Sequence, residues 1–298
     1  MKTRFAVTPP ASALSGPEFP HYLARAESLS FDTVWLSDIP LGAVGDPLLS
    51  LAFAAGMTSR IKLGANIVPL GRNPLWIAKQ IAQLDRLSNG RALISFVPGL
   101  AQPGERPALG HSTGDRGKVL EEMMALLRCW WAGEPVAATF GEFSFEDIRL
   151  APQPVQEPLE IWLGGKSQAA LDRVARCADG WLTAAMSPDE AAQGRAEVVR
   201  RAGEYGREID PEHFGVSLPY SNGPPSATAV ATLAERRKDG DVSEVLAIGA
   251  GGLSDLVQAY QAAGFSKFVV RPVERSGSGG DWIDELDWLA DTVLPLQT

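Results

Sequence analysis

The stretch that decides the fold is Ile61–Arg91, which reads IKLGANIVPLGRNPLWIAKQIAQLDRLSNGR. Its first eight residues form a short, mostly apolar run, as in a strand that is buried on both faces. The run from Pro74 to Leu87 has helical spacing, and proline suits the first turn of a helix because the amide it lacks has no partner there. Arg91–Val97 follows as another apolar strand. Strand, helix and strand in this order predict a parallel β–α–β unit.

The same alternation continues in both directions from this unit. Strands are expected at Phe5–Thr8, Thr33–Ser37, Ile61–Val68, Arg91–Val97, Glu160–Leu163, Gly180–Thr183, Phe214–Leu218 and Lys267–Val270. Helices are expected at Pro17–Leu29, Pro47–Met57, Pro74–Leu87, Arg116–Trp131, Gln168–Cys177, Asp189–Tyr205, Leu253–Ala263 and Trp282–Leu294. This pattern predicts an α/β protein whose strands close into a (β/α)8 TIM barrel.

We expect residues 1–298 to form a single domain, with insertions near 98–115, 132–158 and 219–243. An open, doubly wound sheet is the alternative architecture. No GxGxxG motif follows the first strand, which counts against that alternative.

Composition excludes several classes of protein. Hydrophobic residues make up 45% of the 298 residues, which is typical of a globular protein, and no apolar run approaches the length of a membrane span. A net charge of -9 disfavours nucleic acid as a partner. The three histidines are far apart in the sequence and predict no metal site. Of the three, only His111 is expected on the catalytic face of a barrel, in the loop after the fourth strand. Two cysteines, both in helical runs, and a short apolar stretch at the N-terminus favour a cytoplasmic protein.

The most informative motif for chemistry is the turn Gly164-Gly165-Lys166-Ser167, which joins an apolar strand to a helix. Glycines allow the backbone to approach a ligand closely, and the start of a helix presents unpaired N–H groups to an anion. Lys166 adds a positive charge. The turn therefore has the chemistry of a phosphate site, although a plain strand-to-helix connection with Ser167 as the N-cap remains the alternative.

Two further features stand at strand ends. Asp38 follows the second strand, where a carboxylate in a barrel serves function or caps a turn. Gly64 and Asn66 interrupt the third strand, which marks either a close ligand approach or a distorted strand.

Several linked stretches together resemble the bacterial luciferase-like family of flavin- and F420-dependent oxidoreductases. They are FDTVWLSD (31–38), the block at 61–91, IWLGGKSQAALDRVARCADGW (161–181) and AYQAAGFSKFVVR (259–271). The resemblance covers nearly the whole chain and implies a TIM barrel with insertions.

The resemblance also implies site residues. The cofactor ring would lie at the C-terminal mouth of the barrel, against a cis peptide bond that would fall at Asn66-Ile67. The phosphate would bind the backbone at the turn 164–167, and Gly180 and Trp181 would close the site behind it. The cofactor-binding positions are accordingly Asp38, Asn66, Ile67, Gly99, Gly164, Gly165, Lys166, Ser167, Gly180 and Trp181.

The chain departs from the family at two acid–base positions. Where relatives that oxidise alcohols carry histidine after the second strand, this sequence has Ile39, and where some place a catalytic glutamate after the fourth strand it has Leu100. Removal of an alcohol proton needs a base, so a dehydrogenase of that type is disfavoured and no catalytic residue is assigned. We expect hydride transfer between the reduced cofactor and an unsaturated small molecule, which would be apolar or aromatic if Trp35, Phe96, Leu100 and Trp181 line the mouth. Filling of the core by these residues is the alternative, and it is favoured for Trp35.

Cofactor and assembly follow from the same resemblance. The 61–91 block and the 259–271 ending favour F420, with FMN and a luciferase-like monooxygenase as the alternative. A barrel that binds a flavin or F420 without turnover, or binds no cofactor, is the second alternative. The apolar helices Pro47–Met57 and Pro74–Leu87 must be buried on nearly all sides, which predicts a homodimer.

Overall fold

The computed structural model describes residues 1–10, 14, 17–99, 104–110, 115–237, 240–273 and 282–298. Leu100 and His111 lie outside the described residues. The chain forms two compact parts: a terminal part, residues 1–35 and 163–298, and a middle part, residues 36–162. Each part is described by itself.

All sixteen expected strands and helices are present, with boundaries within a few residues of those expected. The strands are β1 (Arg4–Val7), β2 (Thr33–Ser37), β3 (Lys62–Ile67), β4 (Ala92–Phe96), β7 (Ile161–Leu163), β8 (Gly180–Ala184), β9 (Phe214–Ser221) and β11 (Lys267–Pro272). The helices are α1 (Glu18–Ser28), α2 (Pro47–Met57), α3 (Pro74–Leu87), α5 (Arg116–Trp131), α6 (Gln168–Cys177), α7 (Pro188–Glu204), α9 (Gly249–Ala262) and α10 (Trp282–Val293).

The regions expected as insertions contain elements that the periodicity did not resolve. They are α4 (Glu105–Ala108), the strands β5 (Val136–Phe140) and β6 (Phe143–Ile148), and α8 (Ala227–Arg236). Outside these regions lie β10 (Ala247–Ile248) and a short 3-10 turn at Leu294–Leu296, and another 3-10 turn at Val242–Glu244 spans the end of the third region. The strands β5 and β6 form an antiparallel hairpin of their own.

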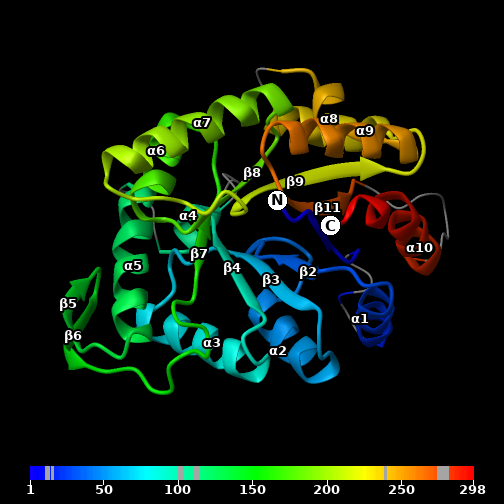
Figure 1. Cartoon of the computed structure of the whole chain (residues 1–298). Coiled ribbons are helices and arrows are strands. Elements are labelled where there is room, and N and C mark those ends of the chain that lie inside the picture. Colours follow the sequence, from blue (N-terminus) through cyan, green and yellow to red (C-terminus); the bar gives the residue numbers. More distant parts are fainter. Residues whose placement is uncertain (11–13, 15–16, 100–103, 111–114, 238–239, 274–281) are drawn as a thin grey trace. The chain divides into compact units, whose positions relative to one another are not determined.

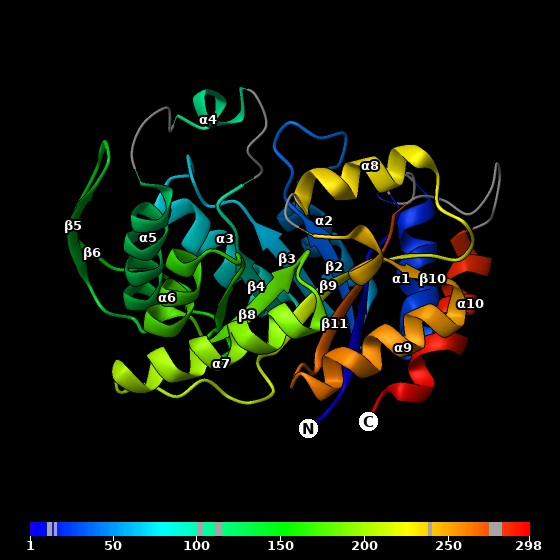
Figure 2. The ribbon, with the colours of Figure 1, turned by 90° about the horizontal axis from the view of Figure 1, so that it is seen from above.

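The terminal part is built on a parallel sheet. In it β8 pairs with β9, β9 with β11, β11 with β1, and β1 with β2. The short strand β10 pairs in parallel with the last two residues of β9, Tyr220 and Ser221. Helices α6, α7 and α9 lie side by side along this sheet (Figures 1 and 2). The face they cover is the core, where Phe214 contacts Phe265 and where the Arg195 guanidinium lies 4.6 Å from the centre of the Phe214 ring.

The middle part contains β3 and β4, which pair in parallel from Leu63–Ala92 to Ile67–Phe96 without a register shift. Asn73 caps α3 by accepting the amides of Leu75 and Trp76, and Pro74 occupies its first turn as expected. Such capping fixes where the helix begins, and therefore how the strand–helix unit is connected.

The LDRLSNGR block has a structural role in this part. The Asp85 carboxylate is fully buried and accepts hydrogen bonds from the amides of Val155 and Gln156 and from the Gln156 side chain, at 2.6–2.9 Å. Arg91 donates to carbonyls at Ile61 and Ser88. A buried carboxylate with three donors holds the long connection after β6 against the end of α3.

Candidate functional site

The Gly164–Ser167 turn lies in the terminal part and has the local structure that the sequence predicts. Ser167 is the N-cap of α6, and its hydroxyl accepts the Ala170 amide at 3.2 Å. Gly165 has φ +113°, and a Cβ there would lie 2.8 Å from the Ala170 methyl group. Residues 165–167 are exposed, so the backbone N–H groups at the start of α6 are accessible to a ligand. An exposed helix N-terminus of this kind presents hydrogen-bond donors to which an anion can bind.

A cavity of about 460 Å³ opens beside this turn, lined among others by Lys166, Ser167, Glu190 and Arg237. Arg237 is already paired, because it donates to Glu190 at 2.7 Å, to Glu244 and to the Ala185 carbonyl at 3.2 Å. The Lys166 ammonium makes only a long contact of 3.4 Å with the Ala185 carbonyl, and among the described residues it has no carboxylate within ion-pair distance. Lys166 is therefore the positive charge available to an anion in this cavity.

Trp181 supports the turn from behind. Its indole N–H donates to the Gly165 carbonyl at 2.9 Å, and its ring is fully buried on the helix-covered face of β8 against Phe214 and Phe265. The expectation that Trp181 lines an apolar mouth is wrong, because the ring packs between sheet and helices. Gly180 begins β8, is buried, and does not line the cavity beside Lys166.

Asp38 lies in the middle part and forms an ion pair. Its carboxylate accepts from Arg72 at 2.7 Å and from the Val68 amide at 3.1 Å, and its side chain is 7% exposed. Arg72 also reaches Asp46 at 3.4 Å. Ile39 joins these three charged residues in lining a separate cavity of about 320 Å³. The Asp38 carboxylate is thus engaged in holding Arg72 and the end of β3.

Asn66 and Ser95 occupy paired positions on the same face of β3 and β4. The Asn66 side-chain carbonyl oxygen and the Ser95 hydroxyl are both buried without a hydrogen-bond partner within the described part of the chain. The Asn66 amide group makes a 3.4 Å contact with the Ser37 hydroxyl. Unpaired buried polar atoms are rare and costly, so this face is suited to a polar ligand.

Ile67 and Phe96 lie on the other face of these strands and are fully buried. Phe96 is therefore core filling, and the expectation that it lines an apolar mouth is wrong. The cis peptide bonds of the described residues are Ala151–Pro152 and Glu157–Pro158. The bond between Asn66 and Ile67 is trans, so the cis bond that the family resemblance implies is not present, and β3 keeps a regular register with β4 through both residues.

Glu105 is the residue that the sequence reasoning missed. Gly99 follows β4 with φ +81°, and a Cβ at Gly99 would lie 2.5 Å from a carboxylate oxygen of Glu105 and 3.6 Å from Val68. The Glu105 side chain is 1% exposed. The short helix α4 thus returns a carboxyl group to the end of β4. In the sequence, the segment between β4 and α5 is rich in proline and glycine, which indicated a loop at the catalytic face. That signal did not single out Glu105.

In the described ranges no group of three or more His, Cys, Asp or Glu side chains is arranged to hold a metal ion. No described helix combines the length and hydrophobicity that crossing a bilayer requires.

Comparison with known proteins gives the family. The profile of the luciferase-like monooxygenases matches residues 2–271, and the chain belongs to this family. An FMNH(2)-dependent dimethylsulfone monooxygenase of Pseudomonas fluorescens is 34% identical over 140 residues, 45% of this chain and 38% of that protein. The matched segment is thus less than half the length of this curated relative.

Solved structures give the fold. An F420-dependent secondary alcohol dehydrogenase, solved with an F420-acetone adduct, superposes with a TM-score of 0.82 at 18% identity over 100% of both chains. The F420-dependent tetrahydromethanopterin reductase of Methanopyrus kandleri gives 0.78 at 19% identity, again over 100% of both chains. The (β/α)8 TIM barrel predicted from the alternation is confirmed.

Proposed function

We propose that this chain is an F420-dependent oxidoreductase that adds a hydride and a proton to an unsaturated small molecule. The observation that carries the proposal is the exposed turn Gly164–Ser167, where unpaired amides at the start of α6 accompany the unpaired charge of Lys166. This arrangement matches a phosphate monoester or diester. Two F420-dependent enzymes among the structural neighbours support the choice of cofactor.

The residues of the middle part fit the ring portion of such a cofactor. The unpartnered oxygens of Asn66 and Ser95 are hydrogen-bonding groups of the kind that a flavin or deazaflavin ring, with its carbonyl and N–H edge, would satisfy. When bound, a reduced deazaflavin supplies a hydride. The protein orients the reactants and excludes water.

The reduction also needs a proton, and we assign its delivery to Glu105. Hydride addition to a C=C or C=O bond leaves an anion that must be protonated. The Glu105 carboxyl is buried beside Gly99 at the end of β4, the end of a barrel strand at which catalytic groups gather. Within this proposal Glu105 holds the proton at a carboxyl oxygen and releases it to the acceptor.

An FMN-dependent monooxygenase is the second candidate. It is favoured by the FMNH(2)-dependent enzyme of Pseudomonas fluorescens, which is 34% identical over 140 residues. Fluorescence titration of the purified protein with F420 and, separately, with FMN tests both. Tight F420 and weak FMN binding is expected, the reverse would favour the monooxygenase, and binding of neither would favour a barrel without a cofactor.

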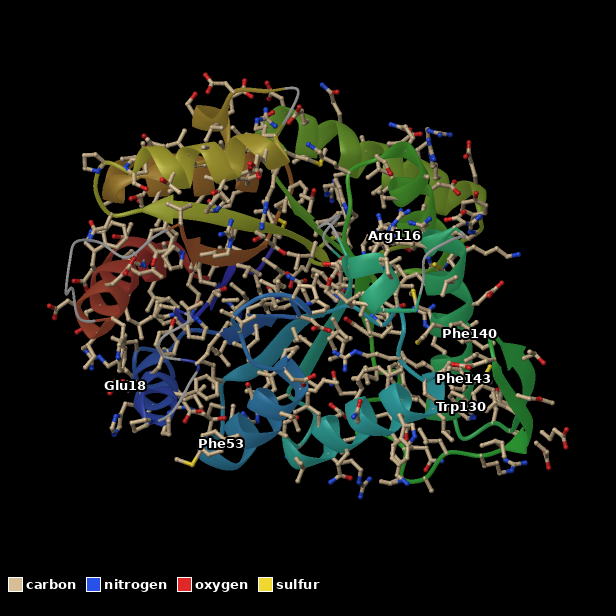
Figure 3. All side chains as sticks on the ribbon, turned by 180° about the vertical axis from the view of Figure 1, so that it is seen from behind. Glu18, Phe53, Arg116, Trp130, Phe140 and Phe143 are labelled. Atoms are coloured by element: carbon tan, nitrogen blue, oxygen red, sulfur yellow. The ribbon has the colours of Figure 1, made fainter. Side chains whose placement is uncertain are left out.

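We also propose that the chain forms a homodimer through α2 and α3, which pack against each other. Their outer surfaces expose large apolar side chains, with Leu49 75% exposed, Trp76 63% and Met57 52%. Phe53 points outward from α2 in Figure 3. Several large apolar side chains exposed on two helices that pack together favour an interface.

A further inference from the structure

Arg271 stands at the end of the last strand of the barrel. It pairs with Pro219 in the register of β11 and β9, one residue before β11 ends. Phe268 pairs with Val216, two residues after Phe214, so the even-numbered residues of β11 face the covering helices. Alternation along the strand places Arg271 on the opposite face. In a TIM barrel that face is the interior, and the carboxyl ends of its strands form the mouth where reactants bind.

Among the described residues, no carboxylate compensates the charge of Arg271. The residue is half-buried, and in the regions that the structure describes its guanidinium has no hydrogen bond and no carboxylate within ion-pair distance. Burial, together with the smaller effect of the neighbouring Arg236 guanidinium, lowers the pKa of Arg271 to about 10. At neutral pH the side chain therefore remains a cation, although its surroundings disfavour the charge.

The acid on the neighbouring helix is engaged elsewhere. Burial, the charge of Glu285 and a hydrogen bond to it raise the pKa of Tyr220. Tyr220 pairs with Pro272, on the helix-covered face, and packs on Trp288. Glu285 thus acts on that face, and in the part of the chain that the structure describes Arg236 is the charged group that acts on Arg271.

We infer that Arg271, assisted by Arg236 at the end of α8, binds an acidic group of a ligand at the barrel mouth. A half-buried cation without a counter-ion is costly, and a carboxylate or phosphate that accepts two parallel N–H bonds from the guanidinium relieves that cost. That this ligand takes part in the reaction, as substrate or cofactor, rests on the proposed function. It narrows the substrate class, because an acceptor bound here carries a carboxylate or phosphate and is not purely apolar.

The acidic group has two possible sources. One is the substrate, and the other is the acidic tail of the cofactor. Both present the same chemistry to the guanidinium, so the experiment must separate them.

Chemical modification tests the site without turnover and without a bound cofactor. Phenylglyoxal attacks the uncharged guanidine, so Arg271 should be modified faster than exposed arginines such as Arg149, as measured by peptide mass spectrometry. Benzoate or inorganic phosphate at about ten times its Kd should slow modification of Arg271 about tenfold by simple occupancy. Benzamide, which has the shape of benzoate without its charge, should give no protection.

The outcomes separate the sources. Benzoate that still protects Arg271 in protein saturated with F420 or FMN places the acidic group on the substrate side. A saturating cofactor that itself protects Arg271 and abolishes the benzoate effect places the acidic group on the cofactor. Modification at the same rate in every anion overturns the inference, whichever cofactor the protein proves to bind.

Three variants complete the test. Benzoate should raise the Tm of the wild type and of Arg271→Lys, which keeps the charge, but not that of Arg271→Gln. Arg236→Gln should slow the modification of Arg271, because it removes the neighbouring positive charge. A benzoate effect that survives unchanged in Arg271→Gln would contradict the assignment.

Discussion

The indole N–H of Trp181 donates a 2.9 Å hydrogen bond to the carbonyl of Gly165. This bond ties the proposed phosphate turn to the core of the terminal part, since the Trp181 ring is fully buried between β8 and the helices. The turn is thereby held in a conformation that is ready for a ligand, although its own residues are exposed.

Replacing Trp181 by phenylalanine should therefore weaken cofactor binding. The loss of a buried hydrogen bond costs about 1 kcal/mol of stability. Trp130→Phe is the matched control, because the Trp130 ring is also fully buried and its indole donates to the Ile148 carbonyl at 3.0 Å. Both variants should lose similar stability in urea, and only Trp181→Phe should lower affinity in the fluorescence titration. Equal affinities in the two variants would show that the bond does not position the turn.

A side chain at Gly165 should close the turn to phosphate. Gly165→Ala places a Cβ 2.8 Å from Ala170 and forces a residue with φ +113° into a conformation that L-residues avoid, at a cost of roughly 1–2 kcal/mol. We expect a folded protein with at least tenfold weaker cofactor binding. Gly203→Ala is the control, because that position in α7 has open space around it and alanine favours a helix. Unchanged affinity in Gly165→Ala would remove the phosphate assignment.

Loss of the Asp38 carboxylate should destabilise the middle part. Asp38→Ala leaves Arg72 without its shorter ion pair and the Val68 amide without an acceptor, for an expected loss of about 1–3 kcal/mol. Asp38→Asn keeps an acceptor for Val68 and should lose less. The measurement is urea unfolding, and an Asp38→Ala variant as stable as the wild type but deficient in cofactor binding would assign Asp38 to the cofactor instead.

Removing the proposed proton donor, Glu105, should lower kcat without changing cofactor affinity. Glu105→Gln preserves the shape of the side chain and removes its acidic proton, so we expect cofactor affinity to stay unchanged while kcat falls about 10²-fold or more. An equal effect on KM and kcat would indicate a binding role. If kcat is unchanged, the proton comes from water or another residue.

Acid should destabilise the cavity beside α6. Burial alone would raise the pKa of Glu190, but the Arg237 hydrogen bond and the Ser187 amide lower it below the ordinary value of 4.5. A lowered folded-state pKa means that this interaction stabilises the fold above 4.5 and is lost as the pH falls through the lowered value. Tm measured from neutral pH downward should fall less steeply in Glu190→Gln than in the wild type. Glu235→Gln, at an exposed position, should follow the wild type.

The proposed dimer gives a test on the surface. Trp76→Glu or Leu49→Glu should convert a dimer into a monomer in gel filtration, because a charge on the apolar surface of α2 and α3 opposes burial. Val199→Glu, also at an exposed apolar residue but on α7, should leave the assembly unchanged. A wild-type protein that elutes at the mass of one chain would contradict the proposal.

The sequence predicted the barrel because its signals are local. Proline or a capping side chain marks the start of α2, α3 and α6, and apolar runs mark each parallel strand. The Ser167 cap and the exposed turn before it were predicted for the same reason.

The rest of the candidate site depends on which face of a strand a residue occupies and on contacts between distant segments. Continuous apolar runs do not show that Phe96 and Trp181 face the helices, since both faces of a barrel strand are buried. Glu105 follows Gly99 closely in the sequence. However, a loop has no periodic pattern from which the direction of the Glu105 carboxylate could be predicted. The pairing of Asp38 with Arg72 and the isolation of Arg271 likewise arise only when the strands are assembled.

The β5–β6 hairpin has a practical consequence. Its tip at Gly141 faces open space, while its base is anchored by the Trp130 indole on the Ile148 carbonyl and by a T-shaped contact of Trp130 with Phe145. Because the anchor is at the base, the tip is the place to splice in an affinity tag or to tether the protein to a solid support. An enzyme immobilised there would keep its strand–helix units undisturbed and could be washed and reused between substrate screens.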